Sequence, residues 1–212
     1  MKIDIVKIKE LEKRVSGIRS KGSGGFYESI RITKDYVIQG GREFGIRDKL
    51  LQLDTLVKEE SVLDFGCNMG GICIDSKRVG AKRVVGIEMS KPYIVEAREL
   101  VKLLGLDIEY HCFNMNDMNL DIFYKTIGNE KFDVVFMLSI WRHIQFEKFF
   151  EWTNNIIKDV LVFEGHPCFA NEKQTCFDML NKYFNFKEIR YVGEADNCVG
   201  KTTGRPLFIC RK

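Results

Sequence analysis

Several residue types that could do chemistry stand directly behind a short apolar stretch that begins at Ser61. The stretch leads into Asp64-Phe65-Gly66-Cys67-Asn68-Met69-Gly70-Gly71, and a helix-like segment follows. Glycines let the backbone turn tightly and approach a ligand, and the first N–H groups of a helix are free donors. Because Asp64 adds a negative charge to this turn, the loop suits a cationic ligand better than a phosphate.

A second carboxylate, Glu88, ends the next apolar stretch, roughly twenty residues beyond the loop, where an acidic partner for ribose hydroxyls is expected. The alternative is that Glu88 only caps the following helix, a role that Ser90 can also fill. A dinucleotide loop requires G-x-G-x-x-G, and Asn68 occupies the place of its second glycine. This departure disfavours NAD(P) without excluding it.

Further candidates follow the strand-like stretch Phe132–Leu138. An imidazole titrates near neutral pH, so His143 could take a proton from a hydroxyl, an amine or water, or it could be purely structural. Trp141 could pack on a substrate ring or simply cover the sheet. Glu164, with His166 close behind it, could contact a polar substrate, although a residue in such a place more often only faces solvent.

The elements that must position these residues alternate regularly between strand-like and helix-like stretches. The strands are nearly continuous apolar runs, as strands buried on both faces of a parallel sheet require. The last two strands have no helix between them and are therefore expected to be antiparallel. The predicted strands are 61–65, 83–88, 108–113, 132–138, 160–164, 186–192 and 206–211, and the main predicted helices are 42–56, 70–79, 91–104 and 172–183.

The composition excludes several classes of protein. The chain has 212 residues, of which 45% are hydrophobic and 30% charged, as in ordinary soluble globular proteins. No apolar run reaches the ~18 residues of a membrane span, and the charged N-terminus is unlike a signal peptide. The seven cysteines include no C-x-x-C pair, so we expect reduced, mostly buried thiols in a cytoplasmic protein, and no metal.

The first residues of the chain are the most basic part of it. Residues 1–24 carry seven basic and three acidic side chains, and Ile5, Ile8 and Leu11 stand at helical spacing. We expect an amphipathic helix that packs on the domain, although a phosphate-binding arm is an alternative. The net charge of +3 for the whole chain does not by itself indicate a nucleic-acid partner.

Taken together, three motifs resemble the successive signatures of class I S-adenosylmethionine-dependent methyltransferases. They are Asp64–Gly70, Val84–Glu88 and Phe132–Phe136, and the resemblance runs from about Ser61 to Lys212. It implies a Rossmann-like α/β fold: a mostly parallel seven-stranded sheet with an antiparallel C-terminal strand and helices on both faces. The run Gly-Cys-Asn-x-Gly and the upstream Gly-x-Arg are similar to a subgroup that includes tRNA wobble-uridine-modifying and small-molecule enzymes.

The resemblance implies roles in binding S-adenosyl-L-methionine. The methionine part would be held by Asp64 and by the backbone of Gly66, Cys67, Asn68 and Gly70. Glu88 would bind the ribose hydroxyls and Met89 would pack on the adenine.

On the adenine side, Asn114 takes the place of the usual acidic acceptor for the adenine amino group. Asp117 is the alternative acceptor, because it lies three residues further on. Met115 would donate its backbone N–H to the ring, or would be core filler. Leu138 ends a strand that borders the cofactor in relatives.

The resemblance also implies an acceptor side. In relatives a His often occupies the position of His143, which is the predicted catalytic base, with Tyr27, Trp141 and Glu164 as substrate contacts. The guanidinium of Arg42 could hold the cofactor carboxylate in a two-pronged pair. Residues 1–60 are predicted to form a helical lid, and residues 61–212 the cofactor-binding methyltransferase domain.

The predicted activity is methyl transfer to oxygen or nitrogen of a small-molecule acceptor. Beyond Ser61 the chain is barely longer than the core itself, which leaves only the first ~60 residues to build a lid. The basic first helix keeps an RNA acceptor, such as tRNA, open as the alternative. Two other classes also stay open, an NAD(P)-dependent oxidoreductase and a cofactor-binding module without turnover.

Overall fold

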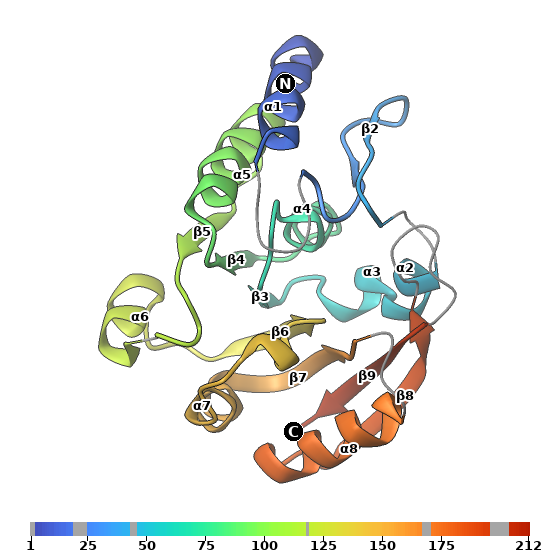
Figure 1. Cartoon of the computed structure of the whole chain (residues 1–212), viewed down its shortest axis with the longest axis vertical. Coiled ribbons are helices and arrows are strands. Elements are labelled where there is room, and N and C mark those ends of the chain that lie inside the picture. Colours follow the sequence, from blue (N-terminus) through green and yellow to red (C-terminus); the bar gives the residue numbers. More distant parts are fainter. Residues whose placement is uncertain (1–2, 19–24, 43–45, 118, 167–170, 196–203) are drawn as a thin grey trace.

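The computed structural model describes residues 3–18, 25–42, 46–117, 119–166, 171–195 and 204–212. Its core is a seven-stranded sheet with strand order β5-β4-β3-β6-β7-β9-β8 (Figure 1). Neighbouring strands are parallel except where β9 lies between β7 and β8. This confirms the predicted Rossmann-like class I architecture. The strands are β3 (Ser61–Phe65), β4 (Arg83–Glu88), β5 (Glu109–Cys112), β6 (Phe132–Leu138), β7 (Ile157–Glu164), β8 (Glu188–Ala195) and β9 (Arg205–Arg211).

Helices cover both faces of the sheet (Figure 1). Successive strand residues point to opposite faces, so Val62 joins one hydrophobic cluster and Leu63 the other. The continuous apolar strands thus supply two separate cores, as a parallel sheet between helices requires. One face is covered by α1 (Ile5–Ser16), α4 (Gly71–Arg78) and α5 (Lys91–Leu104), and the other by α6 (Leu120–Ile127), α7 (Lys148–Ile156) and α8 (Glu172–Tyr183).

The basic N-terminal helix packs along α5. Ile8, Leu11 and Val15 are fully buried, and the apolar spacing of the sequence therefore marks the packed face of α1. On its outer side the Arg14 guanidinium is bonded to the Glu96 and Glu99 carboxylates of α5. Part of the basic face is thus neutralised within the fold. The helical lid expected for residues 1–60 stays a prediction.

Three local features differ from the predicted elements. The helix expected over 42–56 is two helices, α2 (Ile46–Leu51) and α3 (Leu53–Leu56), because Gln52 adopts the left-handed conformation with φ 46°. A short hairpin of β1 (Ile30–Arg31) and β2 (Val37–Ile38) was not expected. Strand β7 begins at Ile157, three residues early, because the exposed Lys158 and Asp159 interrupt the apolar pattern of the strand.

Most of the described cysteines are buried, as the sequence predicted. Cys67, Cys73, Cys176 and Cys210 are buried free thiols and Cys112 is an exposed one, whereas positions 168 and 198 lie outside the described residues. Among the described helices, none has the length and apolar character needed to cross a bilayer.

Candidate active site

The strand order reverses beside β3. The chain runs from β3 through β4 to β5 on one side, then returns to β6 on the other side of β3. In open α/β sheets such a reversal leaves a crevice beyond the carboxyl ends of the strands, where ligands bind. Glu88, Leu138 and Glu164 end three of these strands, and Asp64 stands one residue before the end of β3. The fold therefore gathers the predicted residues along one edge.

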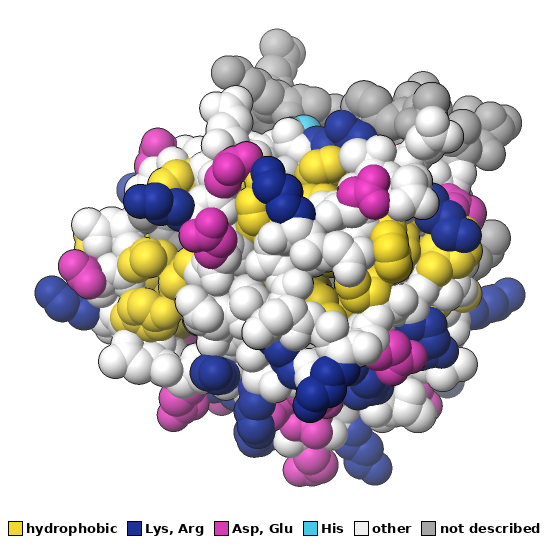
Figure 2. Space-filling model, turned by 90° about the horizontal axis from the view of Figure 1, so that it is seen from below, with side chains coloured by type: hydrophobic (Ala, Val, Ile, Leu, Met, Phe, Trp, Pro, Cys, Tyr) yellow, Lys and Arg dark blue, Asp and Glu magenta, His cyan; other side chains and the backbone are white. Residues whose placement is uncertain are grey.

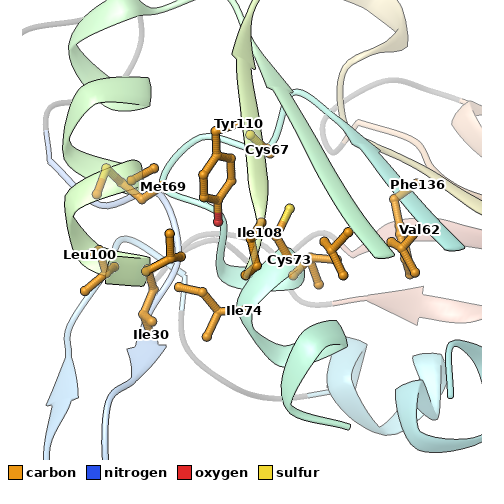
Figure 3. Close-up of a cluster of buried hydrophobic side chains, with 14 of the residues drawn as sticks. Ile30, Val62, Cys67, Met69, Cys73, Ile74, Leu100, Ile108, Tyr110 and Phe136 are labelled. Atoms are coloured by element: carbon orange, nitrogen blue, oxygen red, sulfur yellow. The ribbon is translucent and has the colours of Figure 1, made fainter. Parts of the chain in front are cut away.

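The glycine loop after β3 depends on backbone conformations that favour glycine. Gly66 and Gly70 have φ values of +74° and +79°. The N–H groups of Gly66 and Cys67 both donate to the Ile87 carbonyl at the end of β4, 2.8 and 3.0 Å away. A Cβ atom on Gly70 would lie 1.9 Å from the hydroxyl of Tyr110, which is buried beside the loop (Figure 3). The loop is thus fixed to β4 and packs closely against Tyr110.

Glu88 is held in place by backbone donors from two elements. Its carboxylate accepts from the N–H of Asn68 in the glycine loop at 3.2 Å and from the N–H of Ser90 before α5 at 2.8 Å. A carboxylate has about four lone-pair sites, so two bonds leave acceptor capacity for hydroxyl groups. The bond to Ser90 fits the predicted role of Glu88 at the start of α5, and the remaining acceptor capacity is compatible with the predicted role in binding ribose. Beside it, Met89 is 60% exposed, which leaves its surface open for a planar ring.

Asp64 is buried beneath the glycine loop's surface, as are Cys67 and Met69. It is 4% exposed and accepts from the Cys73 thiol at 3.5 Å. Burial, and then the nearby charge of Glu28, raises the pKa of the Asp64 carboxyl to about 8. Glu28 is paired with Arg47 and lies over the start of α4, against Gly71. Sequence reasoning missed Glu28, because its segment has no strand or helix pattern that would place it here.

The predicted adenine-side residues are bonded to one another. The Asn114 side chain donates to the Asp117 carboxylate at 2.6 Å and accepts from the Asn116 N–H at 3.1 Å. The two alternative acceptors thus form one polar unit after β5. Met115 is buried in the hydrophobic cluster of α6 and α7, so its side chain is core filler.

Arg42 makes its two-pronged pair with a protein carboxylate. Both of its terminal nitrogens donate to Glu164, each over 2.8 Å, and the two side chains are 1% and 0% exposed. Burial alone would raise the pKa of Glu164, but the Arg42 hydrogen bonds and charge outweigh it and hold the pKa below its usual range. The expectation that Glu164 faces solvent is wrong. The guanidinium fork foreseen for the cofactor carboxylate is occupied by Glu164.

A series of polar side chains connects this ion pair to the segment of residues 25–42. The Ser139 hydroxyl donates to Glu164 at 2.6 Å, and Arg205 donates to Ser139 and to the Tyr27 hydroxyl at 2.5 and 2.6 Å. The Tyr27 N–H reaches the side chain of Asn68 at 3.5 Å. The predicted substrate residue Tyr27 therefore joins the acceptor side to the glycine loop. Arg205 was missed, because it stands at the start of the last strand without a motif.

The turn after β6 carries Trp141 and His143, in the short helix η1 (Trp141–His143). The Trp141 indole N–H donates to Glu172 at 3.2 Å, and Arg142 pairs with the same carboxylate. His143 is exposed, and its Nε2 lies 3.3 Å from Nε2 of His166. Glu172, at the start of α8, was also missed, because a first-turn carboxylate usually only complements the helix dipole.

Comparison with known proteins supports what the fold suggests. Residues 62–160 match the profile of a family described as a methyltransferase domain. A protein of Methanocaldococcus jannaschii described as uncharacterized is 33% identical over 70 residues, which cover 33% of this chain and 32% of that protein. Protein arginine N-methyltransferase 1 of Saccharomyces cerevisiae is 35% identical over 80 residues, covering 37% and 22%.

Solved structures give the same picture of the fold. WbdD, described as a bifunctional kinase-methyltransferase, has a TM-score of 0.70 at 17% identity, covering 94% of this chain and 46% of that one. Magnesium protoporphyrin IX methyltransferase of Synechocystis PCC 6803, solved with bound SAM, has a TM-score of 0.56 at 16% identity, covering 78% and 77%.

This chain has the class I methyltransferase fold. The matched profile, residues 62–160, covers just under half of the chain. The chain spans 22% to 32% of the length of the first four curated relatives that it matches. One of these relatives is named a protein arginine N-methyltransferase and two are named ubiquinone biosynthesis O-methyltransferases, so their names indicate no common acceptor.

Proposed function

We propose that the protein transfers the methyl group of S-adenosylmethionine to an oxygen or nitrogen atom of a small-molecule acceptor. The observation that carries the cofactor part is the Glu88 carboxylate, fixed by two backbone N–H groups beside the glycine loop. Such a carboxylate at a strand tip suits two vicinal ribose hydroxyls.

The charge around the loop supports a cationic cofactor. Asp64, Glu28 and Glu88 are close enough for the last two to raise the pKa of Asp64, after burial. A sulfonium-bearing amino acid brings positive charge to this acidic neighbourhood, whereas a pyrophosphate would add repulsion. In our proposal Asp64 faces the ammonium group, Glu88 binds the ribose, and the Asn114–Asp117 unit accepts from the adenine amino group.

Methyl transfer from a sulfonium requires alignment of the nucleophile and exclusion of water more than it requires activation. Positioning of this kind can contribute about 7–11 kcal/mol to lowering a barrier. We assign the base to His143, because its imidazole is exposed at the tip of β6, where Leu138 borders the crevice. A hydroxyl or ammonium acceptor has to lose a proton, and a positioned base typically contributes 10²–10⁴-fold.

A small acceptor is favoured by the floor of the acceptor side. Arg42, Glu164, Ser139 and Arg205 form a buried polar network there, and Tyr27 bonds to its edge. Fixed polar groups of this kind select a small polar molecule by hydrogen bonding. The similarity to the wobble-uridine-modifying subgroup stays a prediction.

An RNA acceptor is the alternative, and the charge distribution gives it less support. Arg14 on the basic helix is engaged with α5. On the face shown in Figure 2, Lys and Arg side chains lie interspersed with Asp and Glu side chains. An RNA acceptor would show affinity that falls steeply with salt, because phosphate contacts release counterions. A steep salt dependence of tRNA binding would favour that alternative.

The proposal is tested by calorimetric titration of the purified chain with S-adenosylmethionine and, separately, with NAD⁺ and NADH. We expect binding of S-adenosylmethionine only, and the reverse result would make the protein an oxidoreductase. Release of S-adenosylhomocysteine is then measured over a panel of hydroxyl, amine and carboxylate acceptors. With the best acceptor, His143→Ala should spare cofactor affinity and slow transfer by about 10²–10⁴-fold. Cofactor binding without transfer to any acceptor would indicate a binding module.

A further inference from the structure

Two of the three histidines of the chain meet at the acceptor side of the crevice. His143 follows β6 and His166 follows β7, and their Nε2 atoms are 3.3 Å apart although 23 residues separate them. The ring planes are inclined by 71° and the ring centroids are 5.1 Å apart. The rings thus approach each other through their Nε2 atoms.

One carboxylate positions both histidines. Glu172 accepts from the Trp141 indole at 3.2 Å and pairs with Arg142, which fixes the turn that carries His143. The same carboxylate accepts from the His166 backbone N–H at 2.9 Å. Glu172 is 6% exposed, so these bonds are shielded from water. The approach of the two imidazoles is therefore built into the fold and is not a chance encounter of surface side chains.

We propose that His143 and His166 together bind a divalent transition-metal ion of the zinc class through their Nε2 atoms. Two nitrogens that bind one tetrahedral zinc ion at about 2.0–2.1 Å are separated by roughly 3.3 Å, which is the separation observed here. Imidazole nitrogen is a preferred ligand of such ions, whereas magnesium and calcium prefer oxygen.

The pair supplies two ligands and leaves the other positions open. Within the described residues, no three His, Cys, Asp or Glu side chains converge on one point, so water or an acceptor oxygen would complete the coordination. An ion with open positions is typical of sites that contact a substrate. Binding of the ion does not depend on the proposed function. A metal-bound Nε2 cannot take a proton, so with the ion bound the ion itself, and not the His143 imidazole, would favour loss of a proton from an acceptor oxygen. This use of the ion rests on the proposed function.

The contacts around the pair limit its affinity for a metal ion. In His166, ligation at Nε2 leaves the remaining proton on Nδ1. This buried nitrogen has no hydrogen-bond partner within the described part of the chain. Such missing support typically costs 10–100-fold in affinity, so we expect a weak site.

The test is a titration of the full, tag-free chain with Zn²⁺, followed by NMR of the histidine ring nitrogens at pH 7. His111, on β5 beside Glu109, is the internal control because it lies on another strand. We expect the ring signals of His143 and His166 to shift together while those of His111 stay in place. All samples, including the reference protein, carry Cys112→Ser, because an exposed thiol also binds zinc.

Variants show whether both rings are needed. His143→Ala and His166→Ala should each weaken Zn²⁺ binding at least tenfold by calorimetry, and His111→Ala should leave it unchanged. His143 is exposed, so its variant is expected to fold even if the His166 variant does not. If Zn²⁺ shifts neither ring, shifts only one, or binds the His143→Ala variant equally well, the pair is a simple hydrogen-bonded contact and the proposal is wrong. S-adenosylmethionine affinity without Zn²⁺ tests the proposed function separately.

Discussion

The two halves of the crevice are built by different means. On the cofactor side, Glu88 is held by N–H groups two and twenty residues away, and the glycine loop bonds to the neighbouring strand. On the acceptor side, Arg42 pairs with Glu164 across 122 residues, and Arg205 reaches Tyr27 across 178. Backbone groups thus form the first half, whereas side chains from distant segments form the second.

This difference bears on what each half can specify. Backbone donors are present whatever the side chain, so a cofactor site made from them depends mainly on glycines and a few carboxylates. A network of side chains changes with each substitution, and by fixing residues at its edge such as Tyr27 it can adapt the site to one particular acceptor. We therefore expect the cofactor half to serve a common ligand and the acceptor half to carry the specificity.

The largest expected effect is on the acceptor half. Glu164→Gln leaves the buried Arg42 guanidinium without a charged partner, so the free energy of unfolding should fall by about 3–5 kcal/mol. Urea denaturation measures this change. Asp159→Asn, which breaks an exposed pair with Arg211, is the matched control and should cost about 0–1 kcal/mol. Equal losses in the two variants would show that burial does not distinguish these ion pairs.

On the cofactor half, Glu88→Ala should weaken S-adenosylmethionine binding at least a hundredfold, because two hydrogen bonds to a charged group contribute about 1.5–3 kcal/mol each. Calorimetry on the folded variant measures the affinity. Glu109→Ala, which removes a carboxylate at the start of β5, serves as the control and should bind normally. Unchanged affinity in Glu88→Ala would overturn the assignment of this carboxylate to the ribose.

The glycine loop permits a sharper test of packing. Gly70→Ala should destabilise the protein more than Gly128→Ala, although both residues have positive φ values of 79° and 87°. A Cβ at Gly128 meets nothing within 4 Å, so that variant should show only the conformational cost, about 1–3 kcal/mol for its φ of 87° and ψ of 168°. At Gly70 the Cβ also collides with Tyr110. Thermal unfolding measures the Tm of both variants. If the Tm of Gly128→Ala fell as far as that of Gly70→Ala, the packing argument would be refuted.

The last prediction concerns pH. The folded protein binds the Asp64 proton more tightly than the unfolded chain, because the pKa rises from 3.8 to about 8. The resulting stabilisation is complete below about pH 4 and is lost as the pH rises through about 8.

We expect Asp64→Asn to flatten the dependence of stability on pH between pH 5 and 9. Each kcal/mol of lost unfolding free energy should lower the Tm by about 2–4 °C. Thermal unfolding of the protein without cofactor measures it, and Asp121→Asn, on the exposed side of α6, is the control. Parallel pH profiles for the wild type and the Asp64 variant would contradict a raised pKa.

The sequence predicted most of the fold because the apolar pattern of a doubly covered strand is strong. Helix α8 begins and ends where expected, and α5 ends at Gly105, whose φ of 67° terminates the helix. The break at Gln52 could not be predicted, since a non-glycine residue in the left-handed conformation leaves no pattern. The β1–β2 hairpin was missed because two-residue strands carry no periodicity.

The sequence by itself determined the cofactor half of the site. Asp64, the glycine loop and Glu88 lie at the ends of neighbouring strands, and chain-local spacing is enough to bring them together. Only the tertiary structure decided that Arg42 is bound to Glu164, that Glu172 organises the turn of Trp141, and that the two histidines meet. The reason is physical, because side-chain pairs between distant segments depend on how the layers pack, and no local spacing records that packing.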